Sequence, residues 1–205
     1  NFMVEHKFLA TLDYKTQLFG NNDTRFSLVF IRKSGEPYSV SFDEPGYNSV
    51  TGNSRFYADY ALAYVPTGAS DPNVSFTSAA VADSVMAHVN STGLSSYKGT
   101  YAPRNAFNSP WYSRLDLRIT QDINVFEDHK VIVYLDLLNL LNLIDDDKGI
   151  VKEYSYNNSR QIIVDGVTSD GKFIIKGVDP DDNLWIQNRD GQSAWNINLG
   201  FKYEF

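Results

Sequence analysis

The stretch Ala194-Trp195-Asn196-Ile197-Asn198-Leu199-Gly200-Phe201-Lys202-Tyr203-Glu204-Phe205 indicates the fold class most clearly. Every second position, from Trp195 to Phe205, is aromatic or aliphatic, and the positions between them are small or polar. Because successive side chains of a β-strand point to opposite faces, we expect a strand at 194–205 with one apolar and one polar face. Strands of about 9–11 residues cross the wall of a tilted membrane barrel. The pattern therefore predicts an all-β protein with a transmembrane antiparallel β-barrel.

An edge strand of a soluble β-sandwich also alternates, and it is the plain alternative for this stretch. Soluble strands, however, are usually about five or six residues long. An unpaired apolar edge of the observed length would also promote aggregation in water. The stretch further resembles the C-terminal insertion signal of outer-membrane proteins, which the barrel-assembly machinery recognises by alternating apolar residues and a terminal Phe. The residues that match this signal are Trp195, Ile197, Leu199, Phe201, Tyr203 and Phe205.

The same alternation predicts strands over much of the chain. The expected strands lie at 7–17, 25–33, 113–124, 130–141, 150–167, 172–178 and 194–205. Short turn sequences at 20–23 and 126–129 predict two hairpins. Between the fifth and sixth strands, Ser169-Asp170-Gly171 is a stronger turn sequence than Asn157-Asn158. Seven strands cannot close a single-chain bacterial barrel, because such barrels have even strand numbers. We therefore expect these strands to be the last part of a larger barrel.

Residues 35–110 break the alternating pattern with Pro, Gly, Ser and Asn. Within them, Ser78 to Val89 has the pattern of a short helix, with Ser78 as its N-cap. A loop of this length is unusual in a compact soluble domain. On an outer-membrane barrel it is expected, because extracellular loops are long and periplasmic turns are short. The sequence therefore predicts one long extracellular loop at 35–110.

The composition excludes several classes of function. The chain has 18 Lys and Arg against 25 Asp and Glu, a formal net charge of −7 and no Cys. An acidic chain without basic runs is a poor nucleic-acid binder, and a chain without Cys has no disulfides and no thiolate metal site. Motifs for a nucleophile elbow, a phosphate-binding loop or a zinc peptidase are missing from the sequence, so we expect neither an enzyme nor a bound cofactor. The first residues have no signal-peptide pattern, which favours a fragment of a longer exported protein.

Several residues are candidates for specific roles. Arg114, Asp116 and Arg118 alternate on the polar face of their expected strand, and with Asp136 they are expected to face the barrel lumen. Aromatic residues that we expect at the two membrane interfaces are Trp111, Tyr112, Phe201, Tyr203 and Phe205. Acidic groups that offer hard oxygens to Ca²⁺ are Asp145, Asp146, Asp147, Asp179, Asp181 and Asp182. Neither acidic group has EF-hand spacing, and solvated loops are the plain alternative.

The order of motifs along the whole chain resembles the C-terminal barrel of TonB-dependent receptors, especially the OmpA-related (Oar-like) subgroup. The matching motifs are Ser34-Gly35-Glu36-Pro37-Tyr38-Ser39, Tyr64-Val65-Pro66-Thr67-Gly68, Asp71-Pro72-Asn73-Val74, Ala102-Pro103-Arg104-Asn105, Ser109-Pro110-Trp111, Arg114-Leu115-Asp116-Leu117-Arg118-Ile119, Asp136-Leu137-Leu138-Asn139-Leu140-Leu141-Asn142 and Ser193-Ala194-Trp195-Asn196-Ile197. Each motif is common by itself, and their order and spacing together carry the resemblance.

The resemblance implies a function and a set of partners. Such receptors lie in the Gram-negative cell outer membrane, where a 22-stranded barrel surrounds an N-terminal plug and takes up a scarce ligand with energy from TonB. Residues 1–205 would then supply the last seven strands and the extracellular loops. Their partners would be outer-membrane lipid, the barrel-assembly machinery, and the plug and other strands of the same receptor. TonB would be reached only through the absent N-terminal part, and the small-molecule or peptide ligand is not encoded in a recognisable motif.

Two other functions are compatible with the residues. One is an outer-membrane barrel of another kind, such as a porin or an autotransporter translocator. The other is a soluble, secreted carbohydrate-binding β-sandwich that uses its Tyr- and Trp-rich loops. The two membrane proteins need detergent or lipid, whereas the sandwich does not, so behaviour in water separates them.

Overall fold

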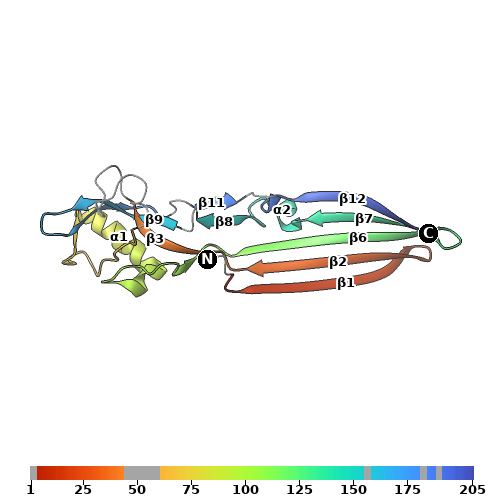
Figure 1. Cartoon of the computed structure of the whole chain (residues 1–205), viewed down its shortest axis with the longest axis horizontal. Helices are drawn as coiled ribbons and strands as arrows, with labels where there is room; N and C mark the ends of the chain where they lie inside the picture. Colours follow the sequence, from red (N-terminus) through yellow and green to blue (C-terminus); the bar gives the residue numbers. More distant parts are fainter. Residues whose placement is uncertain (1–3, 44–60, 155–157, 181–183, 188–190) are drawn as a thin grey trace. The chain divides into compact units, whose positions relative to one another are not determined.

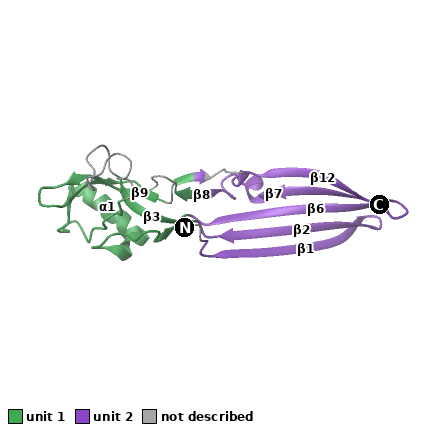
Figure 2. Cartoon of the chain, viewed as in Figure 1, with its two compact units in different colours: residues 1–3, 36–109, 153–185 green, residues 4–35, 110–152, 186–205 purple. Residues whose placement is uncertain are grey.

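The computed structural model describes residues 4–43, 61–154, 158–180, 184–187 and 191–205. The chain is mostly β-sheet, and it forms two compact units (Figure 2). Unit 1 is built from the described parts of 36–109 and 153–185, and unit 2 from those of 4–35, 110–152 and 186–205. None of the helices among the described residues has the length and apolarity needed to span a membrane.

Unit 2 is built on a five-stranded sheet in which every pair of neighbours is antiparallel (Figure 1). Its strand order is β1-β2-β6-β7-β12. The strands are β1 (Lys7–Phe19), β2 (Asn22–Lys33), β6 (Tyr112–Phe126), β7 (His129–Leu138) and β12 (Asn196–Glu204). β1, β2 and β6 have 13, 12 and 15 residues, about twice the usual length of a strand in a soluble protein.

Both hairpins expected in unit 2 are confirmed. β1 and β2 are joined at Gly20, whose φ of +61° is the left-handed conformation that glycine adopts at low cost. β6 and β7 are joined by Glu127 and Asp128, and Glu127 also has a positive φ, +45°. The two turns lie at the same end of the sheet, because both follow strands that run in the same direction.

Unit 1 contains a mixed sheet with the order β4-β10-β9-β3-β5. Its strands are β3 (Pro37–Asp43), β4 (Val74–Phe76), β5 (Phe107–Asn108), β9 (Asn158–Val167) and β10 (Phe173–Val178). The helix α1 (Ala79–Ser91) and the 3-10 helix η2 (Gly93–Tyr97) complete the unit. The buried core includes Phe42, Ile162 and Ile175 from the sheet and Val85 and Val89 from α1.

The helix expected at 78–89 is confirmed as α1. Ser78 has extended backbone angles, and its hydroxyl accepts a hydrogen bond from the N–H of Val81 at 3.2 Å. This contact satisfies one of the amide groups that the first helical turn leaves without a partner. The turn at Ser169-Asp170-Gly171 is also confirmed, since it separates β9 from β10.

The expectation of seven strands in one wall is wrong. Only five of them form the sheet of unit 2, whereas β9 and β10 pair with each other and with β3 and β4. The region 150–167 also holds two strands rather than one, because β8 (Val151–Tyr154) pairs with β11 (Leu184–Gln187) in a separate sheet. The physical reason is burial: Ile162, Val164 and Ile175 are fully buried, so these strands belong to a packed core.

Residues 35–110 are not a plain loop, which is a second correction. They contain β3, β4, β5, α1 and η2. Residues 39–42 of β3 are buried on both faces. The apolar residues Tyr38, Val40 and Phe42 do alternate with polar ones, but Pro37 and Pro45 enclose this short run, and prolines are typical of loops.

The strand expected at 130–141 ends earlier, at Leu138 of β7. Asn139 has a φ of +55°, and the short helix α2 (Leu140–Ile144) follows it. Asn tolerates the left-handed conformation better than most residues. Its N–H donates to the Asp116 carboxylate at 2.8 Å, and its side-chain amide donates to the carbonyl of Gly149 at 2.8 Å. These two hydrogen bonds fix the backbone at Asn139, where β7 ends and α2 begins.

Candidate functional site

The strand register of unit 2 gives the sheet two chemically different faces. In an antiparallel pair, residues directly opposite each other point to the same face. One row across the sheet runs from Leu12 through Leu28, Leu117 and Leu137 to Ile197. All five side chains of this row are therefore apolar and lie on one side.

The neighbouring rows continue this apolar face. Its members are Phe8, Ala10, Leu12, Tyr14, Phe26, Leu28, Phe30, Leu115, Leu117, Ile119, Ile123, Val131, Val133, Leu135, Leu137, Ile197, Leu199, Phe201 and Tyr203. None of them is buried, and on β12 Leu199 and Phe201 are 75% and 77% exposed. An apolar patch of this extent on a soluble protein marks an interaction surface or a membrane contact.

The strand expected at 194–205 is confirmed as β12, shortened to Asn196–Glu204. Ile197, Leu199, Phe201 and Tyr203 lie on the apolar face, in register with β7. Trp195 and Phe205 lie just outside the strand, and both are exposed. The alternation of the proposed insertion signal is thus real, and its recognition by the assembly machinery stays a prediction.

Aromatic side chains gather at both ends of the apolar face. At one end Trp111 stacks with His6 and Phe8, with ring centroids 6.1 and 6.3 Å apart. At the end with the short turns, the His129 ring lies 4.3 Å from that of Phe126 and 5.6 Å from that of Tyr203. Tyr112, also expected at a membrane interface, is instead buried on the opposite face, beneath Lys33.

The residues expected on the polar face are all found there. Arg114 donates a hydrogen bond to the carboxylate of Asp116 at 2.7 Å. Arg118 donates two hydrogen bonds to the carboxylate of Asp136, at 2.5 and 2.7 Å, and so forms a bidentate ion pair. Arg118 and Asp136 are register partners on β6 and β7, which explains the paired geometry. Two parallel N–H···O bonds fix the orientation as well as the charge. Whether this face lines a barrel lumen stays a prediction.

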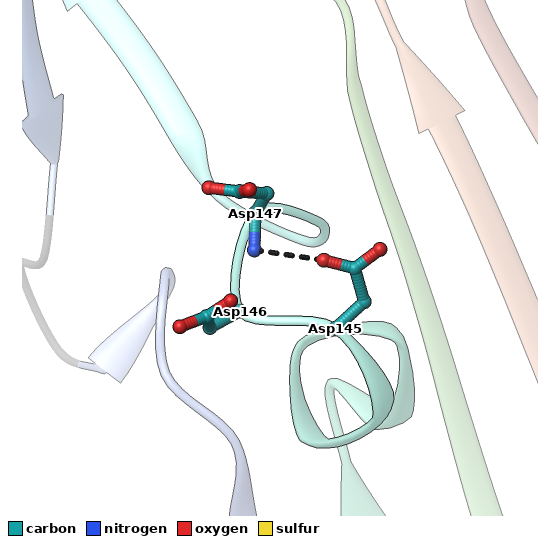
Figure 3. Close-up of side chains that lie close together, drawn as sticks. All are labelled: Asp145, Asp146 and Asp147. Atoms are coloured by element: carbon teal, nitrogen blue, oxygen red, sulfur yellow. Dashed lines mark hydrogen bonds between the residues drawn. The ribbon is translucent and has the colours of Figure 1, made fainter.

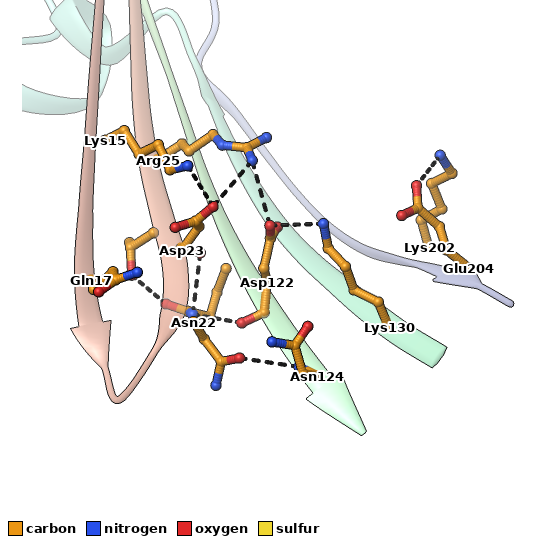
Figure 4. A network of polar contacts seen from close by, with 12 residues as sticks. Lys15, Gln17, Asn22, Asp23, Arg25, Asp122, Asn124, Lys130, Lys202 and Glu204 are labelled. Carbon is orange, nitrogen blue, oxygen red and sulfur yellow. Dashed lines mark hydrogen bonds and ion pairs between the residues drawn. The ribbon is translucent and has the colours of Figure 1, made fainter. Parts of the chain in front are cut away.

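A larger ionic network crosses four strands on the polar face near the short turns (Figure 4). Asp23 contacts Lys15 at 2.6 Å and Arg25 at 3.5 Å, while Asp122 contacts Arg25 at 3.5 Å and Lys130 at 2.8 Å. The chain of contacts therefore links β1, β2, β6 and β7. This network was not predicted, although Asp122 lies four residues after Arg118 and so falls on the same strand face as Arg114, Asp116 and Arg118.

Gly200 on β12 provides room for an aromatic ring on the polar face. A Cβ placed on Gly200 would lie 2.4 Å from the ring of Tyr134, its register partner on β7. The guanidinium of Arg118 lies 5.4 Å from the centre of the same ring, within cation–π distance. An aromatic side chain covering a strand glycine is a known way to stabilise a sheet at such a position.

The first acidic group, Asp145, Asp146 and Asp147, is brought together in the loop after α2 (Figure 3). One carboxylate oxygen of each lies within 4.8 Å of the others. Asp145, however, contacts Lys148 at 2.9 Å and accepts the N–H of Asp147 at 3.1 Å. The hydrogen bond from Lys148 lowers the pKa of Asp145. These contacts fit a self-contained turn, so the cluster gives no further support to a calcium site.

The second acidic group expected from the sequence cannot be described as a cluster, because Asp181 and Asp182 lie outside the described residues and only Asp179 is placed.

In unit 1 a different carboxylate, Asp71, is buried and accepts hydrogen bonds from Tyr64, Thr67 and Asn73. Burial raises the pKa of Asp71, but the hydrogen bonds outweigh it, and the net pKa is lowered. With its oxygens satisfied in this way, Asp71 fixes the turn that precedes β4.

Comparison of the chain with protein-family models, with curated proteins and with solved structures finds no match in any of the three. The inference of function therefore depends on the sheet of unit 2, with its apolar and its polar face.

Proposed function

We propose that this chain supplies part of the barrel wall of an outer-membrane TonB-dependent receptor that takes up a scarce ligand. The observation that carries the proposal is the two-faced sheet of unit 2, with an unburied apolar face and an ion-paired polar face. In an outer-membrane barrel the apolar face contacts lipid and the polar face lines the interior. The resemblance to the receptor family supplies the more specific part of the proposal, namely TonB-dependent uptake.

The height of the apolar face supports a membrane-spanning wall. Ile123 lies twelve positions after Trp111 on the same face. It belongs to the same row as Val131 and Tyr203, and Tyr203 is part of the aromatic group at the other end of the face. At about 3.3 Å per residue the two aromatic ends are ~40 Å apart along the strand, or ~30 Å across a bilayer for a tilt of about 40°. An outer-membrane barrel has an apolar band of about 25 Å between two aromatic girdles, which fits this spacing.

The connections give the wall an orientation. The turns at Gly20 and at Glu127 are short, whereas β2 and β6 are joined by residues 34–111, and β7 and β12 by residues 139–195. Because periplasmic turns are short and extracellular loops long, the two turns belong on the periplasmic side. Unit 1, formed from the two long connections, would then be extracellular and would offer the surface for ligand contact.

The polar face has a matching role in this proposal. Its ion pairs, Arg118 with Asp136 and Arg25 with Asp122, satisfy charges that would otherwise be costly in a confined interior. The same face would contact the plug, which lies in the part of the receptor outside these residues. β1 and β12 each have one neighbour among the described strands, and the remaining strands of the barrel would pair with these edges.

A soluble sandwich receives less support. In a sandwich a second sheet packs at about 10 Å on the apolar face, and the inward side chains become buried. In unit 2 none of the apolar side chains that form this face is buried among the described residues, and the one buried residue in its rows is the polar Thr24. The compact core of unit 1 is formed by its own strands and by α1.

The test is the mass and location of the natural polypeptide that carries this sequence. We expect peptides of this chain in detergent-extracted outer membranes, on a polypeptide several times larger than 23.2 kDa. Peptide mass spectrometry of the same band should identify a plug upstream of Asn1. A polypeptide of about that mass in the water-soluble fraction would refute the transporter and favour the sandwich.

A further inference from the structure

A cavity opens on unit 2 at the end of the sheet opposite the short turns. Its volume is about 520 Å³, within the range of small-molecule sites. Its walls come from β2, from the start of β6 and from the segment after α2. The side chains that matter for its chemistry are Phe30, Arg32, Trp111, Asp147, Lys148 and Lys152.

The cavity is cationic although the chain as a whole is acidic. Arg32, Lys148 and Lys152 line it against the single carboxylate of Asp147. Lys148 is engaged by Asp145 at 2.9 Å. In the part of the chain that the structure describes, neither Arg32 nor Lys152 has a carboxylate within salt-bridge distance, and both are exposed. Two cations are thus available to a ligand.

Arg32 is also held in position. Its guanidinium lies 5.4 Å from the centre of the Trp111 ring, which in turn stacks with Phe8. Stacking on an indole orients the planar guanidinium and leaves its N–H groups free to form hydrogen bonds. An arginine arranged in this way favours an anion with several oxygens, such as a phosphate.

The cavity is continuous with the apolar face. Phe30 lines the cavity and also belongs to the row of apolar residues that includes Leu115. Arg32 lies on the same face one row further, opposite Ser113. A ligand that fills the cavity with an anionic group therefore meets apolar side chains directly below it. This combination fits an amphiphile rather than a small soluble anion.

We infer that this cavity binds the phosphorylated headgroup of a membrane lipid, whose acyl chains lie along the apolar face. Arg32 and Lys152 contact the phosphate, and Phe30 and Trp111 contact the first part of the chains. The inference rests on the proposed function, because only a lipid-facing surface would present the cavity to such a molecule. In the proposed orientation the lipid belongs to the outer leaflet.

The test uses the purified natural polypeptide in detergent and fluorescent phosphatidic acid, whose headgroup is a phosphate monoester. The double variant Arg32→Gln, Lys152→Gln should bind the probe at least about tenfold more weakly, because two charge-assisted contacts are lost. The matched control, Lys7→Gln, Lys176→Gln, removes two exposed cations outside the cavity and should bind within about twofold of the parent. Heat-dependent electrophoretic mobility checks that every variant is folded.

Two competitors separate a lipid from a free anion. Unlabelled phosphatidic acid should displace the probe, whereas diacylglycerol and inorganic phosphate at the same concentration should not. Equal displacement by inorganic phosphate, or unchanged binding by the Arg32→Gln, Lys152→Gln variant, would overturn the inference. A protein that extracts from outer membranes but shows either result loses only this inference, whereas a protein that is soluble without detergent loses the proposed function as well.

Discussion

Leu12 and Thr11 are adjacent on β1 and point to opposite faces of the sheet. Leu12 is 63% exposed and belongs to the apolar row of Leu28 and Leu117, whereas Thr11 is exposed on the polar face. Leu117 lies six residues from Trp111 and six from Ile123, so this row falls at the centre of the apolar face. We expect the substitution of Arg at these two positions to have very different costs.

The cost follows from the solvent on each face. An Arg on the lipid face of a barrel costs about 2–4 kcal/mol at the bilayer midplane. A substitution at an exposed site in water usually changes stability by less than about 0.5 kcal/mol. Leu12→Arg should therefore lower the free energy of unfolding by about 3 kcal/mol, which is more than a hundredfold in the folding equilibrium. Thr11→Arg, on the polar face, should cost less than about 1 kcal/mol.

The assay is urea titration of the natural polypeptide folded into phospholipid vesicles, followed by tryptophan fluorescence. Heat-dependent electrophoretic mobility gives an independent measure of the folded fraction. Two equally mild substitutions would mean that the apolar face of unit 2 does not contact lipid. A larger cost at Thr11 than at Leu12 would mean that the assignment of the two faces is reversed.

Three further predictions concern polar contacts and packing. A double-mutant cycle of Arg118→Ala and Asp136→Ala should give a coupling of only about 0.5–1 kcal/mol, because Arg118 is 57% exposed; a coupling near zero would contradict the paired geometry. Gly200→Ala should cost about 1–3 kcal/mol in the urea titration, because the new methyl displaces the ring of Tyr134; an unchanged midpoint would refute that contact. Asp71→Asn should destabilise unit 1 by about 2 kcal/mol at pH 7, measured by amide hydrogen exchange. Because the pKa of Asp71 is lowered in the fold, its contribution is present above about pH 4 and is lost as the pH falls through the folded value, so the variant should lose this acid sensitivity.

The sequence predicted unit 2 well and unit 1 poorly, for a physical reason. Strands with one apolar and one polar face leave a period of two in the sequence, and β1, β2, β6 and β12 were predicted from it with ends displaced by only a few residues. A short strand enclosed by prolines is harder to recognise. β3 alternates at Tyr38, Val40 and Phe42, but Pro37 and Pro45 gave its segment the composition of a loop, and it was missed for this reason. β9 and β10 were found but assigned to the wrong sheet.

The candidate sites also differ in how far the sequence predicted them. Arg118 and Asp136 were predicted on one face from spacing alone, and the register makes them partners. The cavity around Arg32 and Lys152 was not predicted, because its residues come from segments more than a hundred positions apart. Such a site becomes visible only when strand order and register are known.

The most direct test of the central claim is whether lipid contact alternates along β12. The sequence contains no Cys, so a single Cys introduced at position 197, 198, 199, 201 or 202 places a fluorescent label at one defined site within it. Position 200 is left unchanged, because a side chain there would displace the ring of Tyr134. In vesicles of brominated lipid, labels at 197, 199 and 201 should be strongly quenched, and labels at 198 and 202 should be quenched weakly. Quenching that is equal at all five positions, or absent from all of them, would contradict a membrane-facing wall.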